Sequence, residues 1–79
     1  KNKPLHMVNK EEALKELNLS DKEIKVYLSL LMLGQSTVNA IAKKSNLNRV
    51  TTYDILKALL EKGFVSYVII SGVKHFEAV

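Results

Sequence analysis

The sequence contains no cysteine, which excludes a disulfide framework and a zinc site built on thiolates. No apolar run in it approaches the ~20 residues that a transmembrane helix needs. The opening residues, KNKPLHMV, are too short and too polar for a signal peptide. We therefore expect a cytoplasmic protein that does not enter a membrane.

The residue patterns of enzymes and of cofactor-binding proteins are missing as well. His6 and His75 are far apart in the sequence, and neither is paired with a nucleophile or with a cluster of metal ligands. No glycine-rich loop that could cradle a phosphate group is present. We expect no enzymatic activity, no metal and no cofactor, and no small-molecule site is evident in the chain.

The apolar residues that are present suffice for the core of one small domain. The chain has 79 residues, of which 47% are hydrophobic, so intrinsic disorder is not expected. Its net charge of +4 is uneven, with +1 in residues 1–34 and +3 in residues 35–79. A positive surface suits an anionic partner. A soluble surface kept away from neutrality explains the same charge, and both readings stay open.

The sequence predicts a flexible basic arm at residues 1–8 and a folded winged helix-turn-helix domain at residues 9–79. Pro4 disfavours helix in the arm. The segment NKEEALKELN then predicts a short helix, which Asn9 caps and which has acidic residues in its first turn. Its buried side is expected to consist of Ala13, Leu14 and Leu17.

A second helix is expected from Asp21 to about Leu33. Ser20 and Glu23 form a capping box before it, and Gly34 ends it. The helix has two apolar stripes, an expected core stripe of Ile24, Tyr27, Leu28 and Leu31 and an outer stripe of Val26, Leu30 and Leu33 with Met32 beside it. We expect the first helix, a partner subunit or both to cover the outer stripe, because such a surface is rarely left in water.

The segment TVNAIAKKSN predicts a third, short helix, with Ser36 or Thr37 as its cap. Asn46 follows as a residue that tolerates left-handed geometry in a turn. The fourth helix is expected at about 48–62, with Asn48 as cap and an inward stripe of Thr52, Ile55, Leu56 and Leu59. A short helix, a tight turn and a longer helix form a helix-turn-helix, whose second helix enters the major groove of DNA.

After Gly63 the apolar period changes from 3.6 to nearly 2, which predicts a β-hairpin. Ser71 and Gly72 supply the turn. With a two-residue loop, Tyr67 pairs with Phe76 and Val65 with Ala78, which buries one face on the helices. The expected fold is therefore mainly α with a C-terminal β-hairpin, a winged helix-turn-helix (α-α-α-α-β-β) whose wing is residues 64–79.

Residues 17–79 resemble the DNA-binding domain of the TrmB-type archaeal transcriptional regulators and, at greater distance, the MarR-like winged helices. The segments that carry the resemblance are LNLSDKEIKVYLSLLMLG (17–34) and VNAIAKKSNLNRVTTYDILKALLEKGFV (38–65). The resemblance implies a sequence-specific, double-stranded DNA-binding transcriptional regulator that works in the cytoplasm on the nucleoid. It assigns to the recognition helix Arg49, Val50, Thr51, Tyr53 and Lys57.

The sequence departs from the family pattern at three places. Asn48 stands where the family usually has proline, and Leu60 stands where it usually has a charged residue. The wing tip, which we define as residues 70–73, usually carries more charge, whereas here Ile70 and Val73 flank the turn. Larger members continue into a domain that senses sugars, and the resemblance does not extend to that function here.

The expected DNA contacts are of two kinds: contacts to phosphates, which position the protein on the duplex, and contacts to base edges, which read the sequence. Arg49 is the candidate for bidentate contact to guanine, and Val50 or Thr51 for contact to a thymine methyl group. Tyr53 lies either in this surface or against the core, and Asp54 either orients Arg49 or Lys57 or faces water. The remaining candidates, for phosphate contact or for supporting the helix starts, are Ser36, Thr37, Lys43, Lys44, Asn48, Lys57, Lys74 and His75. A solvated helix face is the alternative for the lysines, and an ordinary hairpin position is the alternative for His75.

One winged helix contacts few phosphates, so we expect a homodimer on half-sites roughly 34 Å apart. We expect the dimer interface to be formed by the stripe of Val26, Leu30 and Leu33, by Leu60 or by the wing. The alternative function is a winged-helix protein–protein interaction module that uses the apolar wing tip or the outer stripe of the helix at 21–33. Salt-sensitive binding to duplex DNA distinguishes the two functions.

Overall fold

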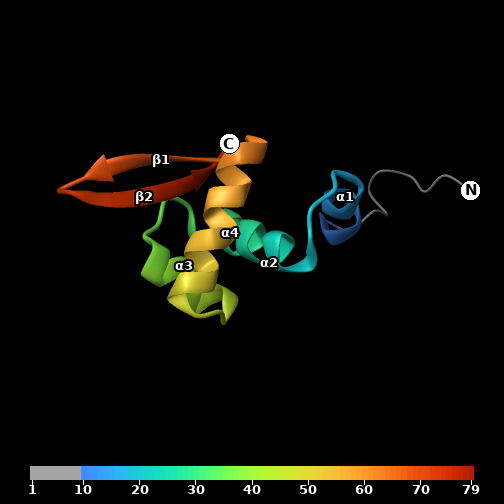
Figure 1. Ribbon diagram of the computed structural model, residues 1–79, viewed down its shortest axis with the longest axis horizontal. Helices are drawn as coiled ribbons and strands as arrows, with labels where there is room; N and C mark the ends of the chain where they lie inside the picture. The colour runs from blue at the N-terminus through green and yellow to red at the C-terminus, as the bar shows by residue number, and fades with distance from the viewer. Residues whose placement is uncertain (1–9) are drawn as a thin grey trace, which may run out of the picture.

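Four helices precede a two-stranded antiparallel hairpin in the computed structural model, which describes residues 10–79 (Figure 1). The elements are α1 (Lys10–Glu16), α2 (Asp21–Leu33), α3 (Val38–Ser45), α4 (Arg49–Lys62), β1 (Val65–Ile70) and β2 (Val73–Ala78). This order confirms the expected winged helix-turn-helix. The arm expected at residues 1–8 and the cap expected at Asn9 lie outside the described residues.

The helices begin where side chains satisfy their first N–H groups. Ser20 and Glu23 form the expected capping box, in which the N–H of Ser20 donates to Oε1 of Glu23 at 2.9 Å. Thr37, and not Ser36, is the cap of α3, because its Oγ1 accepts from the N–H of Ala40 at 3.3 Å. In α4 the N–H of Thr51 donates to Oδ1 of the cap Asn48 at 2.7 Å.

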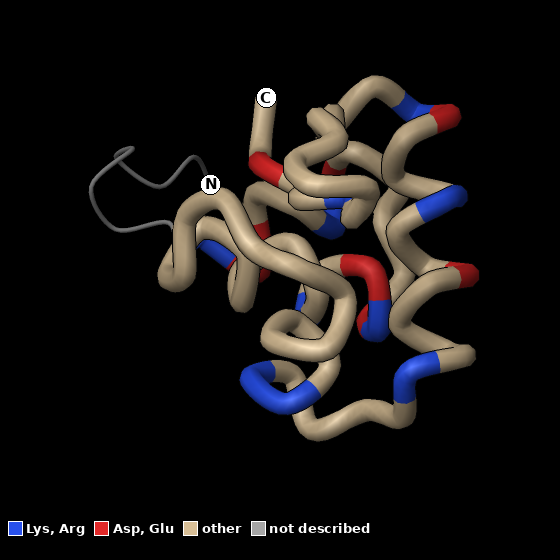
Figure 2. Tube along the Cα trace, turned by 90° about the vertical axis from the view of Figure 1, so that its left-hand side faces the viewer, with Lys and Arg blue, Asp and Glu red and all other residues tan. Residues whose placement is uncertain are grey.

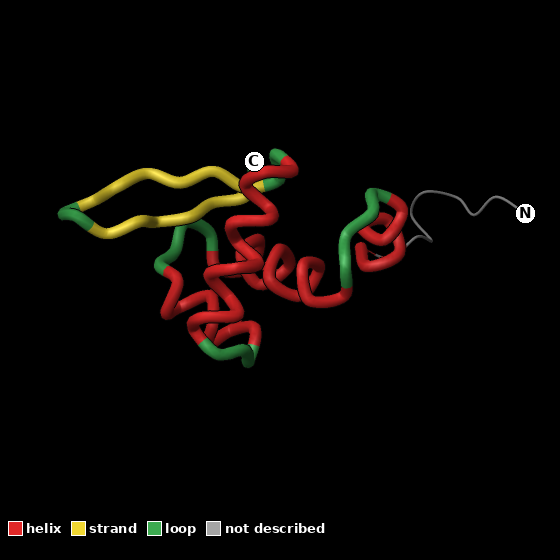
Figure 3. Tube along the Cα trace, in the orientation of Figure 1, coloured by secondary structure: helices red, strands yellow, loops and turns green. Residues whose placement is uncertain are grey.

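The turn between α3 and α4 is short (Figure 3). Asn46 adopts the left-handed conformation that was expected of it, with φ 59° and ψ 41°. Leu47 follows, half-buried, and packs against the core. The turn thus sets the direction in which α4 leaves the helix-turn-helix.

The core lies where α2, α3, α4 and the base of the hairpin meet. Its fully buried apolar side chains are Val26, Leu30, Ile41, Leu56, Leu59 and Phe76. Two of them, Val26 and Leu30, were expected in the outer stripe of α2, whereas Leu31, expected in the core, is 44% exposed. The expected faces of α2 were therefore wrong in part: α3, α4 and β2 all contact this helix, and Val26 and Leu30 are among its buried residues.

This correction also bears on the dimer surface that the sequence suggested. A stripe of Val26, Leu30 and Leu33 cannot meet a partner, because the first two side chains are inside the monomer. Leu33 remains exposed and Leu60 is half-buried against the core.

Helix α1 lies apart from the other elements, beside the start of α2 and on the opposite side from the hairpin (Figure 1). None of its residues is buried. Of the expected inward side chains, Ala13 is exposed, Leu14 is half-buried and Leu17, just beyond the helix, is exposed. The expected burial was therefore right in part at Leu14, which packs against the core, and wrong at Ala13 and Leu17.

The hairpin has the expected register, with Val65 opposite Ala78 and Tyr67 opposite Phe76. The turn residues Ser71 and Gly72 both have positive φ, 52° and 78°, as a two-residue hairpin turn requires. Only the base of the hairpin is buried, at Val65 and Phe76.

A bridge to the loop before α3 fixes the base of the hairpin. The N–H of Phe76 donates to the carbonyl of Ser36 at 2.7 Å, and the N–H of Ser36 donates back at 2.9 Å. Beyond this bridge the hairpin projects away from the helices (Figure 1). The expected burial of one face is thus confined to the base.

Candidate nucleic-acid interface

The N-terminal half of α4 presents its polar side away from the core. Its inward residues are the expected Thr52, Ile55, Leu56 and Leu59. Thr52 can be fully buried because its hydroxyl donates to the carbonyl of Asn48 at 2.8 Å. Arg49 and Val50 point outward, and Val50 is 72% exposed. The buried ridge thus holds the first turn of α4 free to meet a partner.

Arg49 is held by a residue of α3 that the sequence did not single out. Its Nε donates to Oδ1 of Asn39 at 2.8 Å. Asp54, which was expected to orient Arg49 or Lys57, or to face water, is exposed and makes neither bond. The helical period shows that Asn39 faces outward, but only the angle between α3 and α4 brings it to Arg49.

Tyr53 connects α4 to the wing. Nζ of Lys74, on β2, donates to the Tyr53 hydroxyl at 3.2 Å and lies 4.7 Å from the centre of the Tyr67 ring. The hydrogen bond to Tyr53 raises the pKa of Lys74, which therefore stays charged. Nζ of Lys57 also lies over the Tyr53 ring, at 5.8 Å from its centre. The ring packs against the core while its hydroxyl reaches the wing.

A groove of about 340 Å³ runs between the starts of α3 and α4 and the turn of the wing. We name it the wing groove; its lining residues are Thr37, Val38, Asn39, Arg49, Tyr53, Gly72, Val73 and Lys74. The structure thus brings together four of the expected site residues, Thr37, Arg49, Tyr53 and Lys74.

Other expected site residues lie outside this groove. The Ser36 side chain is buried and its hydroxyl donates to the carbonyl of Gly34 at 2.6 Å, so the fold itself uses it. Nδ1 of His75 lies 3.0 Å from the carbonyl of Val73. The exposed residues among them are Lys43, Lys44, Asn48, Val50 and Lys57, while Thr51 is half-buried.

The end of the molecule around the α3–α4 turn is positively charged. Helix α3 contains Lys43 and Lys44 and no acidic residue, and α4 has no acidic residue in its first turn. At this lower end of the molecule in Figure 2 the coloured positions are Lys and Arg only. An anionic partner would meet no repulsion there.

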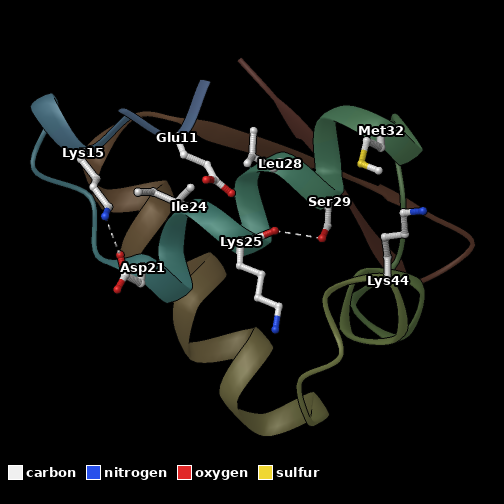
Figure 4. A pocket seen from close by; sticks show the side chains of 9 residues that line it. All are labelled: Glu11, Lys15, Asp21, Ile24, Lys25, Leu28, Ser29, Met32 and Lys44. Atoms are coloured by element: carbon white, nitrogen blue, oxygen red, sulfur yellow. Dashed lines mark hydrogen bonds and ion pairs between the residues drawn. The ribbon is translucent and has the colours of Figure 1, made fainter. Parts of the chain in front are cut away.

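A second cleft, of about 530 Å³, lies on the side of α2 that faces α1 (Figure 4). Leu28 and Met32 contribute its apolar part, and Lys15 lies 3.7 Å from Asp21 at one end. No residue of α4 or of the wing lines it. Within residues 10–79 no group of side chains could hold a metal ion, and no helix is long and apolar enough to span a membrane.

A helix-turn-helix followed by an antiparallel β-hairpin defines the winged helix-turn-helix class. Within that class the chain belongs to the TrmB family: residues 14–79 match the family model described as sugar-specific transcriptional regulator TrmB. The family is one of transcriptional regulators and not of enzymes.

Two curated relatives are similar to this chain in sequence. The uncharacterized protein YrhO of Bacillus subtilis is 41% identical over 61 residues, which are 75% of this chain and 22% of that protein. The HTH-type sugar sensing transcriptional regulator TrmBL1 of Pyrococcus furiosus is 37% identical over 57 residues, which are 72% of this chain and 17% of that protein. The chain thus matches about a fifth of each relative's length, and one relative is bacterial while the other is archaeal.

Solved structures share the fold. A MarR family regulator from Silicibacter pomeroyi has a TM-score of 0.74 at 20% identity, over 86% of this chain and 47% of that chain. A MarR family protein from Bacillus stearothermophilus has a TM-score of 0.75 at 23% identity, over 87% of this chain and 49% of that chain. These likenesses confirm the winged helix-turn-helix architecture.

Proposed function

We propose that this chain is the sequence-specific, double-stranded DNA-binding part of a transcriptional regulator, with α4 in the major groove. The observation that carries the proposal is the exposed first turn of α4, in which Arg49 lies at the edge of the wing groove. The fully buried ridge of Thr52, Leu56 and Leu59 supports this turn from behind.

Reading of base pairs is assigned to three adjacent residues. The Nε of Arg49 is already bonded to Asn39, so its two Nη groups are the donors left for the O6 and N7 of a guanine. Val50 and the methyl group of Thr51 would contact a thymine methyl group. Since Val50 is exposed, its burial against a base would add apolar contact area.

Positioning is assigned to the residues around the wing groove. One phosphodiester strand would run through the groove, between the major groove under α4 and the minor groove under the wing. Lys74 and the amides at the start of α3 would contact its phosphates. Lys43, Lys44 and Lys57 would contact neighbouring phosphates from exposed positions.

We further infer that the protein binds DNA as a homodimer in the cytoplasm, on the nucleoid. A single copy offers few phosphate contacts, and two copies on half-sites about 34 Å apart would multiply the affinity of one. The exposed apolar residues of α2 support a second copy there, since Leu31, Met32 and Leu33 lie in water in the monomer.

A second candidate function is a protein-interaction module. It is favoured by the exposed apolar residues of the wing, namely Tyr67, Val68, Ile69, Ile70 and Val73. Such residues also occur at sites where a winged helix meets another protein.

Fluorescence anisotropy of duplex DNA distinguishes the two functions. Duplexes selected from a random-sequence pool are titrated at two salt concentrations with the wild type, Arg49→Ala and Lys22→Ala. Lys22 is exposed on α2 and lines no part of the wing groove, so it controls for the loss of one positive charge. We expect salt-sensitive binding that Arg49→Ala weakens about tenfold, and Lys22→Ala leaves nearly unchanged. Equal binding by wild type and Arg49→Ala contradicts the reading role of Arg49.

A further inference from the structure

Strand β1 forms an open edge of the hairpin. The sheet has two strands within residues 10–79, so each strand has one side without a ladder partner. On β2 that side is partly closed, because Phe76 exchanges both backbone hydrogen bonds with Ser36. No described residue pairs with the corresponding side of β1, which faces away from β2 and from the loop before α3 (Figure 1). The wing thus has one covered edge and one open edge.

The hydrogen-bonding pattern identifies the groups that this open edge presents. In an antiparallel ladder, opposite residues alternate between pairs that exchange both bonds and pairs that exchange none. Phe76 uses both of its backbone groups on Ser36, so its partner Tyr67 belongs to a pair that exchanges none. The same holds two residues further on for Ile69, opposite Lys74. The N–H and C=O groups of Tyr67 and Ile69 therefore point away from β2, in a part of the strand where these residues are 40% and 63% exposed.

Strand β1 lacks the features that protect exposed edges in natural β-sheets. Charged side chains, proline and β-bulges usually prevent such an edge from pairing with another chain. The sequence of β1, VSYVII, contains no charge and no proline, and its register with β2 is unbroken. The charged side chains of the hairpin, Lys74 and Glu77, both belong to β2. An uncharged edge rich in β-branched residues is a template for a further strand.

We propose that β1 pairs antiparallel with β1 of a second copy of this chain, across a two-fold axis at Val68. In this register Tyr67 lies opposite Ile69 of the second copy, and Ile69 lies opposite Tyr67. Every outward N–H and C=O group of these two residues then has a partner. The contact uses the exposed outer part of β1, and Val65, which is buried at the base, takes no part.

The backbone of the open edge selects a strand as its occupant. Its alternating N–H donors and C=O acceptors match another extended chain, whereas the phosphodiester backbone of DNA offers acceptors only. The side chains favour a second β1, because Val68 would lie opposite itself and Ile70 opposite Ser66, with no charge across the contact. A strand of six residues makes a small interface, so we expect weak association. The contact uses no residue of α2 and does not depend on the proposed binding of DNA.

Amide hydrogen exchange, measured by NMR at low and at high protein concentration, tests the pairing residue by residue. We expect the amides of Tyr67 and Ile69 to exchange more slowly at high concentration. The amide of Val68, which points toward β2, is the internal control and should change little.

A proline variant removes one of the outward donors. Ile69→Pro deletes an N–H that makes no bond to β2, so the ladder of the hairpin is kept. We expect it to weaken self-association about tenfold in analytical ultracentrifugation. The matched control is Ile69→Ala, which loses the side chain but keeps the N–H. NMR spectra of both variants show whether the hairpin persists.

A cysteine at the proposed two-fold axis supplies an independent test. The chain has no cysteine of its own. Val68→Cys places a thiol opposite itself in a pair that exchanges no hydrogen bonds, where the Cα atoms lie about 4.5 Å apart and a disulfide fits. We expect this variant to form a reducible dimer in glutathione buffer. The control Ser66→Cys, on the same face of β1, would lie opposite Ile70 and should stay monomeric.

Several results would overturn the inference. One is a chain that stays monomeric at every concentration; another is a dimer in which the amides of Tyr67 and Ile69 still exchange fast, because it uses another surface. Equal association of Ile69→Pro and Ile69→Ala, or equal cross-linking of the two cysteine variants, also contradicts it. Protection of the two amides only after duplex DNA is added would show that DNA covers the edge. All of these results leave salt-sensitive DNA binding, and with it the proposed function, unaffected.

Discussion

Asn39 of α3 holds the guanidinium group of Arg49 through a 2.8 Å hydrogen bond to Nε. The bond joins the two helices of the helix-turn-helix at the surface, and within residues 10–79 neither Nη group of Arg49 makes a hydrogen bond. In the proposed interface Asn39 would therefore be a positioning residue that acts through Arg49, comparable to the groups that orient a ligating side chain.

Replacement of Asn39 should relax base selection at the position that the proposed function assigns to Arg49. In Asn39→Ala the guanidinium group loses its fixed direction, so we expect a several-fold loss of preference at that base pair. In a double-mutant cycle with Arg49→Ala the coupling should be roughly 1 kcal/mol. The measurement is anisotropy with duplexes altered at single positions. Lys43→Ala is the control, and its effect should add to that of Arg49→Ala. An additive effect of Asn39→Ala would show that Asn39 acts independently.

The Tyr53 hydroxyl should control the mobility of the wing. Tyr53→Phe removes the acceptor of the Lys74 hydrogen bond but keeps the ring that packs against the core. We expect the amides of Gly72 and Val73 to become more mobile in NMR relaxation, while the fold persists.

The matched control for this experiment is Tyr67→Phe. Within the described residues the Tyr67 hydroxyl makes no hydrogen bond, and its ring remains beside Lys74 in the variant. Equal mobility of the wing tip in both variants would contradict the role of Tyr53.

The ion pair between Glu23 and Lys62 should make stability depend on pH in the acid range. Burial alone would raise the pKa of Glu23. The hydrogen bonds from Lys62 and from the N–H of Ser20 together outweigh this effect, so the pKa of Glu23 is lowered below its ordinary value. The unfolded chain therefore binds this proton at a higher pH than the folded chain does. The stabilisation is complete above the unfolded pKa and is lost as pH falls through the folded pKa.

Urea unfolding between pH 3 and pH 7 measures this effect. Glu23→Gln should flatten the acid limb of the stability curve. Lys62→Met should cost about 1 kcal/mol at pH 7, a value reduced for solvent screening because Lys62 is partly exposed. The control Asp21→Asn breaks an exposed pair of 3.7 Å and should have little effect. An unchanged acid limb in Glu23→Gln would refute the assignment.

Phe76 should be the residue whose truncation damages the wing most. Its ring is fully buried between the hairpin base and the helices, and its backbone bridges to Ser36. Phe76→Ala should lower the free energy of unfolding by about 3–5 kcal/mol. Ile69→Ala, a truncation on the exposed part of the same hairpin, should change it by less than about 0.5 kcal/mol. Equal losses in the two variants would contradict this difference in burial.

Features that depend on neighbours in sequence could be predicted from the sequence. The caps Ser20 and Asn48, the left-handed Asn46 and the pairing of Tyr67 with Phe76 all follow from local geometry. The outward direction of Arg49 followed from the period of α4 as well.

Features that depend on contacts between distant elements could not be predicted. Helix α2 has two apolar stripes, so its period gave no basis for choosing Leu30 over Leu31 as the buried residue. The bond between Asn39 and Arg49 depends on how α3 and α4 cross. The burial of Ser36 depends on a strand partner forty positions away, Phe76. In each case the deciding contact is tertiary.

The bridge between Ser36 and Phe76 divides the hairpin into two parts with different freedom to change. Residues at the base of the hairpin pack in the same core as the helices, so a substitution there disturbs the whole domain. Residues beyond the bridge touch the helical body mainly through Lys74 and Tyr53. The length and the residue types of the outer hairpin can therefore change among relatives while the four helices stay the same.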